Sequence, residues 1–444
     1  MNVVSPTPNT TNSHARTIPK FSGSARELVR QPHRFFLQLT REYGDIVQYR
    51  AAPEPAYLIN HPDYVKHVLV SNGRNYNKNT HLNKYMLESV VGQGLLTSEP
   101  PLWRLQRHLI QPAFHRRNLV QFSDLMTTST RRTMAHLTGY ADRNESFDIA
   151  AEMMRLTLEI VTRALFGYEI GPQAEAVGEA VNTLIEIAKP SRQRFKVTLQ
   201  QLDEIVYTII DQRRQHPHET QKDLLDMLLL ARYEETGEGM SDQQVRDEVM
   251  SLFIAGHETT ANTLSWLWYL LAQHPDVVAK IEAELAEVLN GRSPTPDDFP
   301  QLTYTNQVIK ESMRLYPSAW SISRRALDDD EIDGYHIPAG AIVALSPYTL
   351  HRHPAFWPDP ERFDPDRFTP EQENGRHRYA YVPFGGGARK CIGDQFALME
   401  SIVIIPMILQ QFQMQLVPDH QVEEHALVTL RPQNGILMTI SRKN

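Results

Sequence analysis

A single cysteine, Cys391, limits what this 444-residue chain can be more than any other feature. One thiol cannot form an internal disulfide, and it cannot supply a zinc or iron–sulfur site that is built from several cysteines. Disulfide-rich scaffolds and zinc ribbons are therefore excluded. A chain with one free thiol suits a reducing compartment.

The flanks of this cysteine narrow the choice further. It lies near the end of the stretch Phe-Gly-Gly-Gly-Ala-Arg-Lys-Cys-Ile-Gly, from Phe384 to Gly393, and an amphipathic helical pattern begins at Asp394. Glycines allow tight turns and the close approach of a flat ligand. A thiol near a helix start is stabilised as a thiolate by free N–H groups and the positive end of the helix dipole. The alternative is a buried cysteine that acts as a small apolar side chain, but these flanks favour a metal ligand.

This stretch resembles the haem-binding loop of cytochromes P450, in which a cysteine thiolate is the proximal ligand of the haem iron. The resemblance implies that Cys391 is the axial iron ligand and that the cofactor is haem b, iron protoporphyrin IX. It also implies that Phe384 packs beside the sulfur and the haem, and that Arg389 reaches a haem propionate. Gly393 belongs to the same cofactor-binding loop.

A long helix is predicted in the centre of the chain. Ser241 precedes an apolar-periodic run that ends at His274 and Pro275, where the proline prevents continuation. About 34 residues of helix would extend about 50 Å, the width of a domain. Helical periodicity also covers most of residues 122–316. Short alternating runs predict strands within residues 46–59, 337–345 and 426–440.

These patterns predict a mainly α fold with small β-sheet regions. Seven prolines and five glycines between Pro347 and Gly393 indicate a long irregular meander. No repeat or low-complexity linker divides the chain, so we expect a flexible segment over residues 1–20 and a single domain over residues 21–444. The resemblance implies the cytochrome P450 fold, with the haem between the long central helix and the helix after the cysteine loop.

The long helix contains the run Ala255-Gly256-His257-Glu258-Thr259-Thr260. Gly256 costs about 1 kcal/mol relative to Ala in a helix, and Thr259 can bond back to a carbonyl one turn earlier, so the simplest interpretation is a local kink. The resemblance instead implies an oxygen-activating groove. Glu258 and Thr259 match the family's acid–alcohol pair, with Thr259 beside bound O2 and Glu258 linked to the proton supply. His257 is expected to be a packed or hydrated side chain rather than a second ligand.

Glu311 and Arg314 lie three residues apart and share one face of a predicted helix. Four pairs of this spacing occur in the chain, and spacing alone predicts only a weak solvated contact. The resemblance selects this pair, because Arg367 follows in the segment Phe-Asp-Pro-Asp-Arg-Phe, and implies a buried structural triad of the three side chains. Arg362 lies in a similar segment nearby. Asp366 stands where the family usually has Glu, which leaves one contact of the triad open.

Further cations are expected at the haem carboxylates. Trp103 and Arg107 are four residues apart on a predicted helix, so their N–H groups point the same way. The resemblance places both at a propionate. Arg324 aligns with another propionate ligand, although Arg325 beside it is an alternative. Without the resemblance, each arginine would be interpreted as a surface residue.

The implied reaction is monooxygenation, in which one oxygen atom of O2 enters a C–H or C=C bond of an apolar organic substrate. No Gly-x-Gly-x-x-Gly follows a predicted strand, and only about 50 residues follow the cysteine, so we expect no fused reductase. Electrons would come from a ferredoxin- or flavodoxin-type donor with its reductase. The alternatives are a peroxide-driven or rearranging P450 and a non-catalytic thiolate-haem sensor. Glu258 and Thr259 favour the monooxygenase, because the peroxide-driven and rearranging chemistries do not need a proton pair.

Composition supports an ordinary globular enzyme. Hydrophobic residues make up 41% and charged residues 22%, and 45 basic against 53 acidic residues give a net charge of −8, which argues against a nucleic-acid partner. No signal peptide and no transmembrane segment is expected, so the protein is predicted to be soluble, cytoplasmic and monomeric. An acidic donor would need a local basic face. Its candidates are Arg104, His108, Arg116, Arg117, Arg376, Arg378 and Lys390.

The substrate stays open between a fatty acid, a terpenoid and a polyketide. Three parts of the chain are expected by resemblance to line an apolar pocket: residues 75–96, Ala255 and residues 318–322. The basic run within residues 189–196 could meet a substrate carboxylate or an anionic membrane, although a solvated loop is the simpler interpretation.

Overall fold

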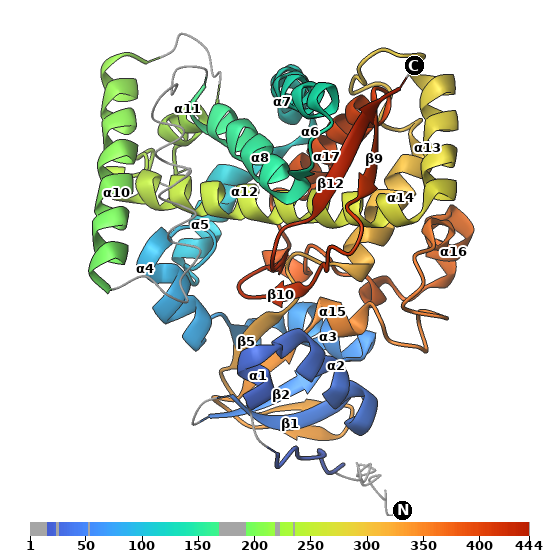
Figure 1. The fold of residues 1–444 in the computed structure, drawn as a ribbon. Coiled ribbons are helices and arrows are strands. Elements are labelled where there is room, and N and C mark those ends of the chain that lie inside the picture. Colours follow the sequence, from blue (N-terminus) through green and yellow to red (C-terminus); the bar gives the residue numbers. More distant parts are fainter. Residues whose placement is uncertain are drawn as a thin grey trace, which may run out of the picture.

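The structure is a computed structural model that describes residues 16–23, 26–51, 54–167, 192–217, 223–233 and 236–443. Helices form most of the molecule, and the strands gather mainly below the long helix that crosses it (Figure 1). The expected mainly α architecture with small sheets is confirmed.

Sixteen α-helices are described among these residues. They are α1 (Arg26–Arg30), α2 (Pro32–Tyr43), α3 (Pro62–Lys66), α4 (Glu88–Val91), α5 (Leu102–Ile110), α6 (Arg116–Leu119), α7 (Ser123–Arg143), α8 (Ile149–Phe166), α10 (Arg192–Gln215), α11 (Leu224–Leu230), α12 (Asp242–Gln273), α13 (Pro275–Val288), α14 (Thr303–Leu315), α15 (Pro347–Leu350), α16 (Pro370–Gly375) and α17 (Asp394–Leu409). Short 3-10 and π-helical turns are η1 (His67–Ser71), η2 (Gly73–Asn75), η3 (Leu82–Leu87), η4 (Gln111–Phe114), η5 (Val120–Phe122), η7 (Pro365–Phe368), η8 (Arg378–Ala380) and η9 (Gly387–Arg389).

The strands form small sheets. They are β1 (Ile46–Ala51), β2 (Glu54–Ile59), β3 (Tyr76–Asn77), β4 (Phe147–Asp148), β5 (Ile322–Ala326), β6 (Asp330–Ile332), β7 (Tyr335–Ile337), β8 (Ile342–Leu345), β9 (Phe412–Leu416), β10 (Glu424–Ala426), β11 (Leu430–Pro432) and β12 (Leu437–Arg442). The largest sheet has the order β1-β2-β8-β5-β3, in which only β2 and β8 run parallel. A second sheet has the order β4-β12-β9, and β6-β7 and β10-β11 form two-stranded pairs.

The long central helix is confirmed as α12. Ser241 caps its start, because the Ser241 hydroxyl accepts from the Gln244 N–H at 3.2 Å and the Gln244 side chain accepts from the Ser241 N–H at 3.1 Å. The helix ends at Gln273, and Pro275 begins α13. Helix α12 packs against α8, α10, α14 and α17, so most of its side chains are buried, polar ones included. It is the internal axis of the helical core (Figure 1).

The expected flexible N-terminal segment is only partly testable, because residues 1–15 lie outside the described residues. Arg16 forms a bridge with Tyr335, and its side chain makes an ion pair of 2.6 Å with Asp333. Lys20 bridges to Gln48 on β1. Residues 16–20 therefore lie along the sheets rather than extending freely.

None of the described helices is both long and apolar enough to cross a bilayer.

Candidate functional site

The cysteine loop is a tightly folded main-chain structure between the meander and α17. Gly385 and Gly387 have positive φ angles of 70° and 68°, which side chains rarely adopt. A Cβ at Gly387 would stand 1.9 Å from the Leu69 carbonyl oxygen, so the loop packs directly on η1. The Cys391 N–H donates to the Phe384 carbonyl at 3.0 Å. These contacts hold the sulfur three residues before the first turn of α17.

The Cys391 sulfur is accessible although protein surrounds the residue. Burial raises the pKa of the thiol, while the Gly393 N–H and the charges of Arg107 and Lys390 lower it. These last three groups favour the thiolate, the form that binds metals. Among the described residues, no group of three or more His, Cys, Asp or Glu side chains could hold a metal ion.

Helix α5 brings two of the predicted residues against the loop in different ways. The guanidinium carbon of Arg389 lies 4.5 Å from the centre of the buried Trp103 ring. Arg107 instead donates from Nη1 to the Lys390 carbonyl at 3.0 Å, and the charges of Cys391 and Asp394 act on it. The structure thus joins Trp103 to Arg389 but places Arg107 beside the sulfur.

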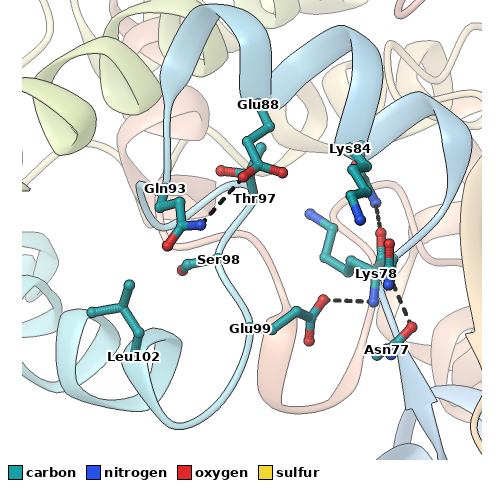
Figure 2. A pocket seen from close by; sticks show the side chains of 11 residues that line it. Asn77, Lys78, Lys84, Glu88, Gln93, Thr97, Ser98, Glu99 and Leu102 are labelled. Atoms are coloured by element: carbon teal, nitrogen blue, oxygen red, sulfur yellow. Dashed lines mark hydrogen bonds between the residues drawn. The ribbon is translucent and has the colours of Figure 1, made fainter.

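A buried cluster of cations lies next to the loop. Arg324 is buried on β5 and is repelled by Arg389, and both act on Lys78. Burial first, and then these two positive charges, lower the pKa of Lys78 to about 7. Glu99 is the carboxylate of the cluster: it accepts from Arg389 Nη2 at 2.9 Å and from the Lys78 main-chain N–H at 2.6 Å. Figure 2 shows Glu99 hydrogen-bonded to Lys78 at the lining of a pocket of about 430 Å³.

The side chains of Arg324 and Arg325, the two alternatives for the propionate ligand, point in different directions. Adjacent residues of a strand face opposite sides of a sheet. Arg324 enters the cluster, whereas Arg325 donates to the carbonyls of Asn79 and Gly340 at 2.7 and 2.9 Å.

The cluster fits the carboxylates of a haem. Nη1 of Arg389 is buried without a hydrogen-bond partner among the described residues, and Arg324 donates to the Ser323 carbonyl. Two arginines and the Lys78 amine, whose pKa is lowered, share one carboxylate, so the cluster carries excess positive charge. A buried excess of this kind is costly unless an anion balances it. The two propionates of a haem would supply that balance beside the accessible sulfur of Cys391.

Helix α12 continues without interruption through its middle, where hydroxyl groups bond to main-chain carbonyls. The Thr259 hydroxyl donates to the Ala255 carbonyl one turn earlier at 2.6 Å. The Thr259 carbonyl accepts from Ser318 at 2.8 Å and from Thr263 at 3.0 Å. Ala255 is exposed and Thr259 half-buried although the helix is internal. A Cβ at Gly256 would lie 3.2 Å from Val161 on α8, so the glycine permits close helix packing.

Glu258 points away from Thr259 into a separate buried environment. Its Oε1 accepts from the Thr429 hydroxyl at 2.6 Å, and this hydroxyl accepts from Asn262 at 3.1 Å. Burial raises the pKa of Glu258, while Thr429, the charge of Arg431 and Asn262 lower it. The acid and the alcohol therefore lie next to each other in sequence but on different faces of α12.

His257 is a packed side chain, as expected. It is fully buried, and Nε2 lies 3.2 Å from the Met154 carbonyl on α8, so Nε2 carries the proton. Burial lowers the pKa of His257 to about 4.

The structure brings the predicted triad together. Glu311 and Arg314 form two hydrogen bonds of 2.6 and 2.8 Å, and both side chains are 0% exposed. Arg367 Nε lies 3.5 Å from Glu311 Oε1. The similar Arg362 contributes only its carbonyl, which accepts from Arg314 at 2.9 Å. Asp366 is exposed and lies 3.8 Å from Lys280, outside the triad.

The expected pocket lining is only partly correct. Ser318 contacts α12 through its bond to Thr259, but Trp320 packs in a core with Phe36 and donates to the Leu427 carbonyl at 2.9 Å. Trp320 is therefore a core residue, since its ring is buried away from α12.

The loop Gly92–Leu95 is attached to α12 through its main chain. The Gln93 N–H donates to Asp247 at 2.9 Å and the Leu95 N–H to Glu248 at 2.8 Å. A Cβ at Gly94 would stand 2.3 Å from the Asp247 carbonyl, so no side chain fits there.

The candidate basic face is smaller than the sequence indicates. Arg376 stacks on Trp357 at 3.9 Å and donates to the Arg367 carbonyl, so it belongs to the meander. Lys390 pairs with Asp394 at 2.5 Å. Arg104, His108 and Arg378 are exposed. The side chains of Arg116 and Arg117, and most of the basic run 189–196, lie outside the described residues.

Three residues of the site were not predicted from the sequence: Lys78, Glu99 and Thr429. Each lies in a loop or turn without periodicity, and its partners are distant in the chain. Lys78 stands between two asparagines and Glu99 precedes a proline, and charged side chains in such loops are normally solvated. No local signal therefore identifies these residues as part of the site.

Comparisons with known proteins agree with this arrangement. The family model described as Cytochrome P450 matches residues 20–439. Cyclooctatin synthase of Streptomyces melanosporofaciens is 36% identical over 425 residues, which cover 92% of this chain and 91% of that protein. Pentalenene oxygenase of Streptomyces avermitilis is 32% identical over 423 residues, which cover 92% of each.

Solved structures show the same similarity. The crystal structure of the cytochrome P450DA heme domain superposes with a TM-score of 0.86 at 29% identity, covering 97% of this chain and 98% of that one. A second cytochrome P450 crystal structure superposes with a TM-score of 0.88 at 26% identity, covering 96% and 99%.

Proposed function

The chain belongs to the cytochrome P450 family and is a haem-thiolate monooxygenase, and on that premise we propose that it oxidises a ring-containing terpenoid. Three bacterial relatives support this substrate class, since they are named Cyclooctatin synthase, Cyclooctat-9-en-7-ol 5-monooxygenase and Pentalenene oxygenase. The exposed Ala255 and the small Ser318 beside Thr259 suit an apolar ligand.

The observation that carries the haem assignment is the buried cation cluster beside an accessible lone sulfur. In this proposal Cys391 is the iron ligand, and the cofactor is haem b. Arg324, Arg389 and Lys78 hold its propionates, and the guanidinium of Arg389 packs on the Trp103 ring. Phe384 and Gly393 complete the loop on the sulfur side. When bound, the haem supplies the binding and reductive activation of O2.

The chain's own chemistry is the control of protons. Thr259 and Glu258 are the acid–alcohol pair in this proposal. The Thr259 hydroxyl already donates to Ala255, so its lone pairs are free to accept a hydrogen bond on the groove side. Burial raises the pKa of Glu258, which suits a general acid. The charge of Arg107 also favours the Cys391 thiolate.

Electrons come, in this proposal, from a ferredoxin- or flavodoxin-type carrier with its reductase. Val70, which is 43% exposed, lies beside Gly387 of the cysteine loop, and Leu105 on α5 is 42% exposed next to the exposed Arg104. An apolar patch with a cation at its rim suits weak docking of an acidic carrier. One free cysteine suits a reducing compartment, so we expect the protein in the cytoplasm. We also expect it to be a monomer.

The test is a binding and turnover comparison. The haem-loaded protein is titrated with cyclic terpene hydrocarbons and alcohols and with fatty acids of similar size, and the shift of the haem absorption band is followed. Ligands that shift the band are then turned over under ¹⁸O2 with a ferredoxin and its reductase. We expect one ¹⁸O atom per terpenoid product. Tighter binding and labelling of fatty acids would overturn the substrate class.

A further inference from the structure

The hairpin β10–β11 contacts α12 at the position of Glu258. Thr429 lies in the turn just before β11, and the next residue, Leu430, accepts from the buried Trp266 indole N–H at 3.0 Å. Trp266 is itself stacked on Tyr316, with 4.3 Å between the ring centres. The turn is therefore anchored to α12 independently of any contact made by Thr429.

The donor and the acceptor of each hydrogen bond at this contact follow from the chemistry of the three side chains. The Asn262 amide donates to the Thr429 hydroxyl at 3.1 Å, and this hydroxyl lies 2.6 Å from Glu258 Oε1. Since the hydroxyl accepts from Asn262, its own hydrogen is directed to Glu258. All three side chains are buried, with at most 5% exposure. Water therefore cannot easily replace a lost partner.

We propose that Thr429, with Asn262 behind it, is a positioning residue that holds the Glu258 carboxyl in one orientation for proton delivery. This inference rests on the proposed role of Glu258 and extends it to residues outside the acid–alcohol pair. A carboxyl with a fixed partner on one oxygen cannot rotate freely, so its proton is presented on one side.

The charges around Glu258 fit this role. Arg431 follows on β11 and favours the carboxylate, and His425 lies opposite Arg431 in the hairpin register. His257, the neighbouring residue on α12, faces α8 through its contact with the Met154 carbonyl. Burial opposes the charge of Glu258, while Thr429, Asn262 and Arg431 support it. Removal of the Thr429 hydroxyl should therefore favour the protonated carboxyl.

The experiment compares Thr429→Val with Thr429→Ser, which keeps the hydroxyl. Peroxide and product are measured per electron consumed by the haem-loaded enzyme. We expect Thr429→Val to lower product per electron about fivefold, the factor expected for one ordinary hydrogen bond, and Thr429→Ser to restore most of it. Ser265→Ala is the matched control, because it removes a buried hydroxyl of α12 that bonds only to the Ala261 carbonyl.

A second readout does not depend on turnover. The infrared band of the protonated Glu258 carboxyl is assigned by its loss in Glu258→Gln and titrated with pH. We expect its midpoint to move upward by about one pH unit in Thr429→Val and in the same direction in Asn262→Ala. The second variant keeps the test valid if Thr429→Val does not incorporate haem.

The outcomes separate the two claims. If Glu258→Gln couples as well as the parent, the proposed role of Glu258 fails. If Glu258→Gln is uncoupled but Thr429→Val keeps the parent's coupling and titration midpoint, only the positioning role is overturned. Equal loss in Thr429→Val and Ser265→Ala would also overturn it, because the effect would then be loss of a buried hydroxyl in general.

Discussion

Replacement of Arg314 by Met should separate the buried triad from ordinary surface ion pairs. Arg314 makes five hydrogen bonds: two to Glu311, and one each to the carbonyls of His351, Pro360 and Arg362. These carbonyls belong to the meander, so one guanidinium joins the meander to α14. Methionine fills a similar length but donates nothing.

The size of the effect follows from burial. Breaking a buried ion pair by removing one partner costs about 3–5 kcal/mol, because the remaining charge stays uncompensated. Unfolding entropy of about 2.1 cal/mol/K per residue gives roughly 0.9 kcal/mol/K for this chain. A loss of about 4 kcal/mol therefore corresponds to a fall in Tm of about 4 °C.

The assay is thermal unfolding followed by circular dichroism at fixed protein and salt concentration. Lys310→Ala is the control: its amine lies 2.8 Å from Glu373, with both side chains about one third exposed, at 34% and 38%, and it should shift Tm by less than about 1 °C. The double change Glu311→Leu and Arg314→Met should recover only part of the loss, since the three carbonyls stay unpaired. A Tm of Arg314→Met within 1 °C of the parent would refute the reasoning.

Three further changes test the haem site and α12. In Cys391→Ser, the red-shifted absorption band of the reduced CO complex that thiolate ligation produces should disappear, and its survival in a haem-loaded variant would remove Cys391 as the ligand. Thr259→Ala should bind substrate and accept electrons as before but divert electrons to peroxide, lowering product per electron by about tenfold or more, whereas Ser265→Ala should not; equal coupling in Thr259→Ala and the parent would contradict its role. The low pKa of His257, about 4 in the fold against 6.5 unfolded, means that the unfolded state binds the additional proton between these values, so stability is complete above pH 6.5 and falls by about 3 kcal/mol as the pH drops to 4. His257→Gln, which can still donate to Met154, should flatten this part of the stability profile measured by urea unfolding, and an unchanged slope would show that another group is responsible.

Local patterns were sufficient for the features that depend on neighbours in the chain. Ser241 and Pro275 mark the two ends of α12, because a capping hydroxyl and a proline ring both act on the main chain within one helical turn. The glycines of the cysteine loop are informative for the same reason, since glycine readily adopts the positive φ angles that other residues rarely adopt. Glu311 and Arg314 also lie within one helical turn, but three other pairs share this spacing, and only the resemblance selected this one.

Contacts between distant segments were not accessible from such patterns. Lys78 has the pattern of a loop cation, and only the fold places it beside Arg324 and Arg389. Arg376 was expected on a docking face, but Trp357 lies close enough to stack on it. Trp320 belongs to a segment that was expected by resemblance to line the pocket, yet its ring packs against Phe36 and its indole N–H donates to the Leu427 carbonyl. In each case the partner lies across the fold, and its identity is decided by tertiary packing.

The bond between the Lys78 N–H and Glu99 has a consequence for how this protein can diversify. This bond joins the two ends of the segment 78–99 (Figure 2). Asp247 and Glu248 hold the loop Gly92–Leu95, which precedes Glu99. Closing a longer loop costs little, about 0.6 kcal/mol for each doubling of its length. Changes near the exposed Lys84 and Ser89 can therefore accumulate without displacing the cations on either side, whereas Val90 and Val91 are buried in the helical core. The substrate-facing stretch and the cofactor cradle can evolve at different rates within one continuous chain.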